Sequence, residues 1–277
     1  MDSAASLPAD AAELPGLYVV PMGVTIDGRT YLDGRDLQAA DFYRLLREAR
    51  ELPTTSAPSP ARFLEAFRSA SERSAAVLCL TAASRFSASL DAARTAAAGA
   101  KEAFPGLEVV VLGSESAAGG QGLIALEAWR TSRDGGGLEE VVAAARRVIH
   151  KVRVVAFLDT LYYLWKGGRV PRIAHAGTSL LGIKPVFEMV RGEVRTVARP
   201  RTQRRAMTRL LELVNEGVER GPLHATVMHA DAPEAAEELR QRLEAMHPCE
   251  ELFVSEFTPV LGAHIGPGLL GIAYWWE

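Results

Sequence analysis

The sequence predicts a two-domain α/β protein. Strand, loop and helix patterns alternate over residues 75–150, which is typical of a parallel sheet with helices on both faces. Beyond residue 155 the pattern changes to shorter strands, a hairpin turn and long amphipathic helices. We therefore expect an N-terminal domain with a parallel sheet over residues 1–155. A second α/β domain, with a mixed or antiparallel sheet, is expected over residues 156–277.

Turn residues and apolar runs define the N-terminal elements. Residues 16–25 form a β-branched run that predicts a strand, and Asp27-Gly28 predicts the tight turn before a returning strand at 29–32. The other predicted elements are a helix from residue 41, a loop over 53–60, a helix over 61–70, a strand at 75–81, a helix that Ser87 caps and that runs to about residue 100, a strand at 107–112, a glycine-rich loop over 114–122, and helices over 123–131 and 138–150.

The C-terminal elements follow from the same signals. Glycines at 167 and 168 predict the end of a short helix. A hairpin turn is predicted at 191–194 because Arg191-Gly192 separates two apolar runs. The other predicted elements are strands at 152–158, 180–190, 225–229, 251–257 and 270–275, helices over 161–165, 203–219 and 232–245, and a loop over 262–268.

Composition and charge exclude several classes of protein. The chain has 277 residues, of which 48% are hydrophobic and 23% are charged, so a large core is possible and global disorder is not. A net charge of −3 predicts no recruitment to nucleic acid and at most transient contact with a membrane. Two cysteines without ligand-like spacing predict neither a zinc site nor a disulfide framework. No secretory signal is recognisable, and a cytoplasmic location is expected.

Two hydroxyl-rich segments are candidates for anion recognition. Thr55 lies in one, before the helix over 61–70, and Ser84 and Ser87 lie in the other, after the strand at 75–81. Hydroxyls and backbone N–H groups near helix ends can bind a carboxylate, whose burial without partners is costly. The alternative is that these residues serve only as caps and turns.

His264 lies in a glycine-rich segment near the C-terminus. Glycines on both sides let the backbone approach a ligand closely, and an imidazole can donate a hydrogen bond to a carboxylate. The alternative is a structural histidine. The other histidines have no neighbouring cluster of ligands, so we expect no metal.

A run of arginines at 199, 201, 204 and 205 is a third feature. Such a run is either a solvated helix face or a docking patch for an acidic partner.

These motifs together resemble the DegV family, which includes the FakB proteins that carry fatty acids for a bacterial fatty acid kinase. The motifs occur in family order along nearly the whole chain. The matching segments are Asp2-Ser3, Val20-Pro21, the Asp27-Gly28 hairpin, Thr54-Thr55-Ser56-Ala57-Pro58-Ser59, Leu164-Trp165-Lys166-Gly167-Gly168-Arg169, Leu181-Gly182-Ile183-Lys184-Pro185 and His264-Ile265-Gly266-Pro267-Gly268.

The resemblance implies a carrier that is not itself an enzyme. Catalysis is expected in a separate kinase subunit, which converts the bound acid to an acyl-phosphate. It implies one long-chain fatty acid, such as palmitate, stearate or oleate, at the interface of two domains of a monomer, and no cofactor. By the same resemblance Thr55, Ser84, Ser87, His264 and Arg169 surround the ligand.

Arg201 matches a position that contacts the kinase in the family's carriers. The sequence departs from the family in the serine loop, where Ala83 replaces a serine and Ser87-Ala88-Ser89-Leu90 replaces Ser-Gly-Thr-Tyr. These departures leave open which of Ser84 and Ser87 contacts the carboxylate.

Two other functions are considered. A lipid-sensing regulatory module would use the same pocket and a different partner for Arg201. A serine-dependent hydrolase would use Ser84 or Ser87 with His264, although no Gly-x-Ser-x-Gly elbow surrounds either serine.

Overall fold

The computed structural model describes residues 1–168, 182–218 and 221–277 and contains three sheets. The strands are β1 (Gly23–Ile26), β2 (Arg29–Leu32), β3 (Thr54–Ser56), β4 (Ala76–Thr81), β5 (Glu108–Gly113), β6 (Arg153–Phe157), β7 (Val186–Val190), β8 (Glu193–Ala198), β9 (Leu223–His229), β10 (Cys249–Glu256) and β11 (Leu270–Trp276). The α-helices are α1 (Ala39–Glu48), α2 (Pro60–Ser71), α3 (Ser89–Ala103), α4 (Ala118–Arg133), α5 (Leu138–Lys151), α6 (Tyr162–Gly167), α7 (Gln203–Gly217), α8 (Pro233–Met246) and α9 (Pro259–Ile265). A short 3₁₀ helix, Ala9–Glu13, was not predicted.

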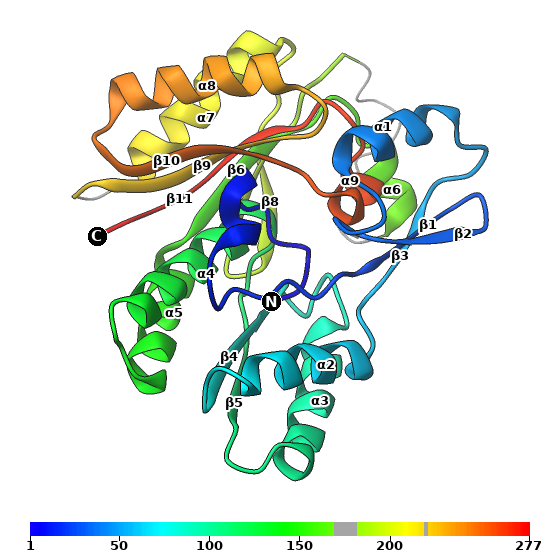
Figure 1. The fold of residues 1–277 in the computed structure, drawn as a ribbon. Helices are drawn as coiled ribbons and strands as arrows, with labels where there is room; N and C mark the ends of the chain where they lie inside the picture. The colour runs from blue at the N-terminus through cyan, green and yellow to red at the C-terminus, as the bar shows by residue number, and fades with distance from the viewer. Residues whose placement is uncertain (169–181, 219–220) are drawn as a thin grey trace.

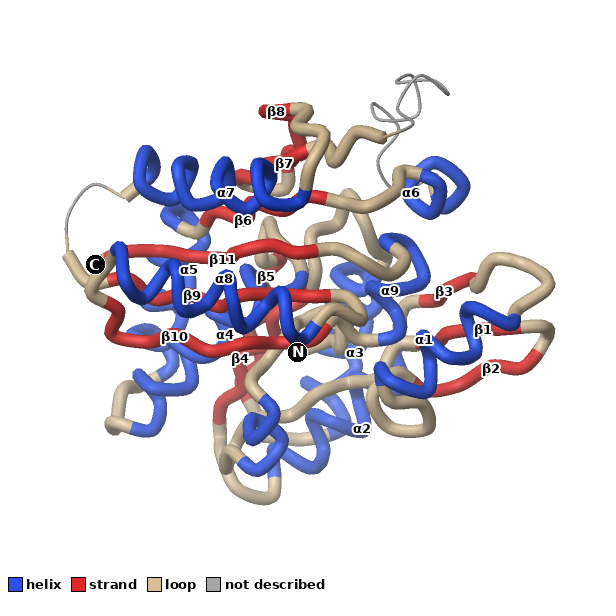
Figure 2. The backbone as a smooth tube through the Cα atoms, turned by 90° about the horizontal axis from the view of Figure 1, so that it is seen from above, coloured by secondary structure: helices blue, strands red, loops and turns tan. Residues whose placement is uncertain are grey.

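The largest sheet has six strands in the order β10-β9-β11-β6-β7-β8. Strands β9 and β10 are parallel, whereas the other neighbouring pairs are antiparallel, so the mixed sheet predicted for the C-terminal part is confirmed. Helices α7 and α8 lie over one face, and α4 and α5 lie on the other (Figures 1 and 2). The predicted division at residue 155 falls within β6 and stays a prediction.

The N-terminal part contains two smaller sheets. Strands β4 and β5 are parallel, with α2 and α3 packed on one side and α4 and α5 on the other, as the alternating pattern predicts (Figure 1). Strands β2, β1 and β3 form an antiparallel sheet, and the predicted hairpin at Asp27-Gly28 is present. The predicted loop over 53–60 is wrong in part, because residues 54–56 pair with β1 as β3.

The predicted glycine-rich loop over 114–122 is also wrong, since α4 begins at Ala118 and contains its glycines. These glycines let the helix approach its neighbours closely. A Cβ atom at Gly119 would lie 2.8 Å from the Met228 Sδ on β9, and one at Gly122 would overlap the Ser6 carbonyl oxygen. Close packing thus outweighs the low intrinsic helix propensity of glycine here.

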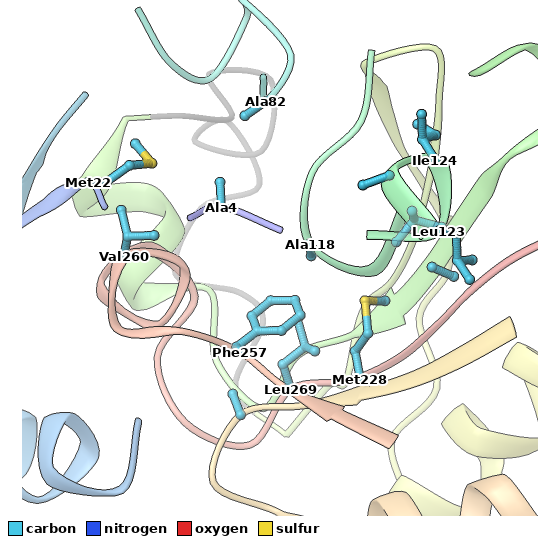
Figure 3. Packing of buried hydrophobic residues seen from close by; sticks show 14 of the residues in the cluster. Ala4, Met22, Ala82, Ala118, Leu123, Ile124, Met228, Phe257, Val260 and Leu269 are labelled. Atoms are coloured by element: carbon cyan, nitrogen blue, oxygen red, sulfur yellow. The ribbon is translucent and has the colours of Figure 1, made fainter. Parts of the chain in front are cut away.

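The main core lies between the six-stranded sheet and the N-terminal segment. Figure 3 shows the side chains of Ala4, Met22, Ala118, Phe257 and Val260, which converge on one region of the core. All of these side chains are buried, and they come from separate elements. This convergence of distant segments creates the site described next.

Candidate functional site

An apolar cavity lies against the face of the six-stranded sheet that α7 does not cover. Segments from both halves of the chain enclose it, including the N-terminal segment, the start of α4, and helices α6 and α9. Its lining consists of Ala4, Met22, Thr55, Ala82, Phe86, Ser87, Ala117, Ala118, Val154, Ala156, Leu158, Leu164, Phe187, Met189, Val194, Phe257, Val260, Leu261, His264, Ile265 and Leu269.

The sheet wall of the cavity is set by strand register. Val154 of β6 is paired with Met189 of β7, which is paired with Val194 of β8, and Ala156 is paired with Phe187. Alternate residues of a strand face opposite sides, so these side chains share one face. Correct strand register and apolar side chains at these positions are therefore sufficient to form this wall of the cavity.

Among the described lining residues, the polar side chains are Thr55, Ser87 and His264. The Thr55 Oγ1 and His264 Nε2 atoms are 2.7 Å apart and form a partly buried hydrogen bond across 209 positions of sequence. Thr55 lies on β3 and His264 lies on α9. The predicted loop over 262–268 is wrong in part, because residues 259–265 form this helix. Two predicted ligand-binding residues thus meet at the edge of an apolar cavity.

Ser87 and Ser84 occupy different positions in the loop after β4. Ser87 lines the cavity, its Oγ atom lies 2.8 Å from the Ser89 Oγ, and it accepts a hydrogen bond from the Ser89 N–H. Ser84 is exposed and is not part of the described lining. Ser87 is predicted to cap the following helix, but α3 begins at Ser89 and Ala88 occupies its N-cap position.

Glycines allow α6 and α9 to pack closely around His264. A Cβ atom at Gly167 would lie 2.9 Å from the His264 Nδ1 atom. Gly266 ends α9 with a φ of +72°, and a Cβ atom there would overlap the Tyr163 ring. The Gly-Gly and Gly-Pro-Gly motifs, far apart in sequence, therefore pack together and orient the imidazole.

A buried polar network behind the cavity was not predicted. Asp2 accepts hydrogen bonds from the Ala82 N–H and the Gln121 Nε2. Asp33 accepts from the Ser3 hydroxyl and the Val260 N–H. No local pattern indicates that Asp33 is buried, because it follows an ordinary β-hairpin and precedes a glycine.

Two predicted residues remain, Arg169 and Arg201. Arg169 lies outside the described residues. Arg201 is exposed in the connection between β8 and α7. Among the described hydrogen bonds, the hydroxyl that contacts His264 is that of Thr55, whereas the Ser87 hydroxyl contacts Ser89.

Two further kinds of feature are absent from the described ranges. No group of three or more His, Cys, Asp or Glu side chains there is arranged to hold a metal ion. No helix within them has the length and apolar character needed to cross a membrane.

Comparison with known proteins identifies clear relatives. The model of the DegV family, described as uncharacterised proteins, matches residues 1–277. A DegV domain-containing protein of Streptomyces coelicolor is 34% identical over 273 residues, which cover 98% of this chain and 95% of the relative.

Two solved structures are similar along their whole length. A fatty-acid-binding DegV family protein from Thermus thermophilus has a TM-score of 0.90 and 32% identity, covering 100% of this chain and 98% of that one. A stearic-acid-binding protein from Eubacterium ventriosum has a TM-score of 0.91 and 25% identity, with coverage of 99% and 96%.

Proposed function

Because this chain belongs to the DegV family, we propose that it binds one long-chain fatty acid and presents it to a separate fatty acid kinase subunit. The observation that carries the proposal is the Thr55–His264 pair at the edge of an otherwise apolar cavity. Relatives with this fold bind fatty acids, including stearic acid. In this proposal the chain is a carrier without catalytic activity of its own.

The chemistry of the two ends of the ligand matches the cavity. Each methylene group moved from water into an apolar site contributes about 0.8 kcal/mol, so the acyl tail supplies most of the affinity. The carboxylate lies beside Thr55 and His264. When the imidazole Nε2–H donates to the Thr55 Oγ1 atom, the Thr55 O–H can donate in turn to the carboxylate. A hydrogen bond to a charged group contributes about 1.5–3 kcal/mol, which fixes the direction in which the acid enters.

Ser87 is the third polar group of this head-group site in our proposal. It lies on the cavity wall, whereas Ser84 does not, so Ser87 is the serine that we assign to the ligand. Arg169 is retained as a proposed ligand contact on the family resemblance alone.

Transfer of the acid to a kinase needs a protein surface as well as a pocket. Arg201 is exposed and close in sequence to Arg199, Arg204 and Arg205, which gives this region of the surface a positive charge. An acidic face of the kinase would be attracted to it. We propose Arg201 as the centre of the docking contact.

Mass spectrometry of an organic extract tests the binding proposal directly. The purified protein should release a long-chain fatty acid, and the delipidated protein should bind added oleate or stearate in preference to the fatty alcohol of equal length. Absence of an acyl chain from the extract, together with no binding of added acid, would overturn the proposal.

A reconstituted kinase reaction tests the second part. Arg201→Glu should slow phosphorylation of the bound acid at least tenfold and leave its binding unchanged. The control is Arg146→Glu, which reverses an exposed charge on α5, on the opposite face of the large sheet. Equal phosphorylation by the Arg201 variant and the wild type would exclude this docking site, and phosphorylation of neither would leave a lipid-sensing role as the better description.

A further inference from the structure

Asp33 is a buried carboxylate that lies outside the cavity lining. Its side chain is 2% exposed. The Ser3 hydroxyl donates to its Oδ2 atom at 2.5 Å, and the Val260 N–H donates to its Oδ1 atom at 3.1 Å. No ion pair to Asp33 is found within the described ranges. The carboxylate is thus held by hydrogen bonds from two distant segments.

The hydrogen bond from the Val260 N–H connects the elements that carry the proposed head-group site. Asp33 directly follows β2, which belongs to the same small sheet as β3 and Thr55. Val260 lies in the first turn of α9, the helix that carries His264. The same pair of structural units is therefore joined twice, once through Asp33 and Val260 and once through Thr55 and His264.

Helix α9 depends on such external contacts for its position. It spans Pro259–Ile265, which is too short for a helix to be stable by itself in water. The segment just before it is held by Thr258, whose hydroxyl donates to the Ser3 carbonyl, and by the Tyr43 hydroxyl, which donates to the Phe257 carbonyl. Asp33 binds the first turn itself through a charge-assisted hydrogen bond.

We propose that Asp33 is a positioning residue that fixes α9 against the small sheet and so maintains the Thr55–His264 spacing needed to recognise a carboxylate. The assignment of the carboxylate to this pair rests on the proposed function. The coupling between Asp33 and His264 is a property of the protein without ligand, and it can be measured separately.

The raised pKa of Asp33 indicates that its ionised form does not stabilise the folded protein. Burial raises its pKa to about 6, although hydrogen bonds from Ser3, Val260 and Thr258 oppose the rise. Asp2, on the N-terminal segment, raises it further, and Tyr43 on α1 is the other titratable group facing it. A raised pKa means that the contribution of this group to stability is full below about pH 3.8 and is lost as the pH rises through about 6. An ionised Asp33 therefore costs stability at neutral pH.

Binding measurements with matched ligands test the proposal. Asp33→Ala should reduce the preference for a fatty acid over the fatty alcohol of equal length about tenfold, because only recognition of the carboxylate needs the exact spacing. Asp33→Asn keeps an acceptor for the Val260 N–H and should restore the preference to within about threefold of the wild type. Asp36→Ala is the control, since Asp36 accepts from the Leu32 N–H in the same turn but contacts no part of α9 in the described hydrogen bonds.

Stability measurements identify a variant that fails to fold. Should Asp33→Ala be unfolded, Ser3→Ala provides the second test, because it removes one donor to Asp33 and should lower the preference in the same direction. Asp33→Asn should gain stability relative to the wild type as the pH rises through about 6. A folded Asp33→Ala or Ser3→Ala variant with the wild-type preference would overturn the proposal.

Histidine NMR on the delipidated protein separates this proposal from the proposed function. The His264 ring resonances, assigned with His264→Gln, should shift in Asp33→Ala and remain in place in Asp36→Ala. This result would support positioning by Asp33 even if no fatty acid bound to the wild type. Unchanged His264 resonances in Asp33→Ala would refute positioning, whatever the ligand proves to be.

Discussion

The sheet wall of the cavity and its polar end are built in different ways. Val154, Met189 and Val194 form a row across three neighbouring strands, and their common direction follows from backbone pairing. Thr55 and His264 come from β3 and α9 and meet through a single side-chain hydrogen bond. Tight glycine contacts and the buried Asp33 carboxylate support that second arrangement.

In our proposal the sheet wall determines the affinity for long-chain ligands, and the polar end determines the discrimination between acid and alcohol. A pleated wall with the correct register tolerates exchanges of one apolar side chain for another of similar volume, because the backbone fixes the direction of each. The polar end has no such tolerance, since a shift of about 1 Å removes a hydrogen bond. Changes in the wall should alter binding of every long-chain ligand, whereas changes at the polar end should alter the distinction between acid and alcohol.

The largest effect is expected when the wall is filled. Ala156→Phe places a ring where the tail should lie, so affinity for both fatty acid and fatty alcohol should fall about 100-fold or more, equivalent to about 2.7 kcal/mol. Isothermal titration calorimetry with both ligands measures the loss. Thr30→Phe is the control, because Thr30 is also a strand residue but is exposed on β2 and is not among the described lining residues. A loss confined to the acid would contradict the assignment of this wall to the tail.

A smaller and more selective effect is expected at the polar end. Thr55→Val keeps the shape of the side chain and removes its hydroxyl, so affinity for the acid should fall about tenfold while affinity for the alcohol changes much less. Competitive displacement of a fluorescent fatty acid gives both values. Thr54→Val serves as the control, since Thr54 is exposed on the same strand. Equal losses for the two ligands would show that Thr55 shapes the cavity and does not recognise the carboxylate.

The contrast between local backbone pairing and distant side-chain contacts also explains which elements could be predicted from the sequence. The parallel pair β4–β5 and its helices were predicted because apolar periodicity and turn residues are local signals. The start of α4 was missed because its glycines indicate a loop, and only their contacts with β9 and Ser6 explain the helix. Likewise α9 was missed because Gly262 and Gly266 obscure a helix of seven residues.

The sequence indicated three residues of the cavity lining but not their arrangement, and their contact with a ligand stays a prediction. Thr55, Ser87 and His264 were candidates from their residue types and from family resemblance, and all three line the cavity. The hydrogen bond between Thr55 and His264 spans 209 positions, and no local pattern specifies such a contact. Asp33 was missed for the same reason, since its burial depends on Ser3 and Val260 from the two ends of the chain.

The smallest expected effect lies in the serine loop, between the wall and the polar end. Ser87→Ala removes a cavity-lining hydroxyl that already has Ser89 as a partner, so affinity for the acid should fall only about threefold. Ser84→Ala is the matched control and should have no effect, because Ser84 is exposed. Titration of both variants with the same fatty acid distinguishes them. A loss of affinity in Ser84→Ala with none in Ser87→Ala would mean that the loop rearranges when the acid binds. The polar end of the cavity would then take its final arrangement only in the presence of the ligand.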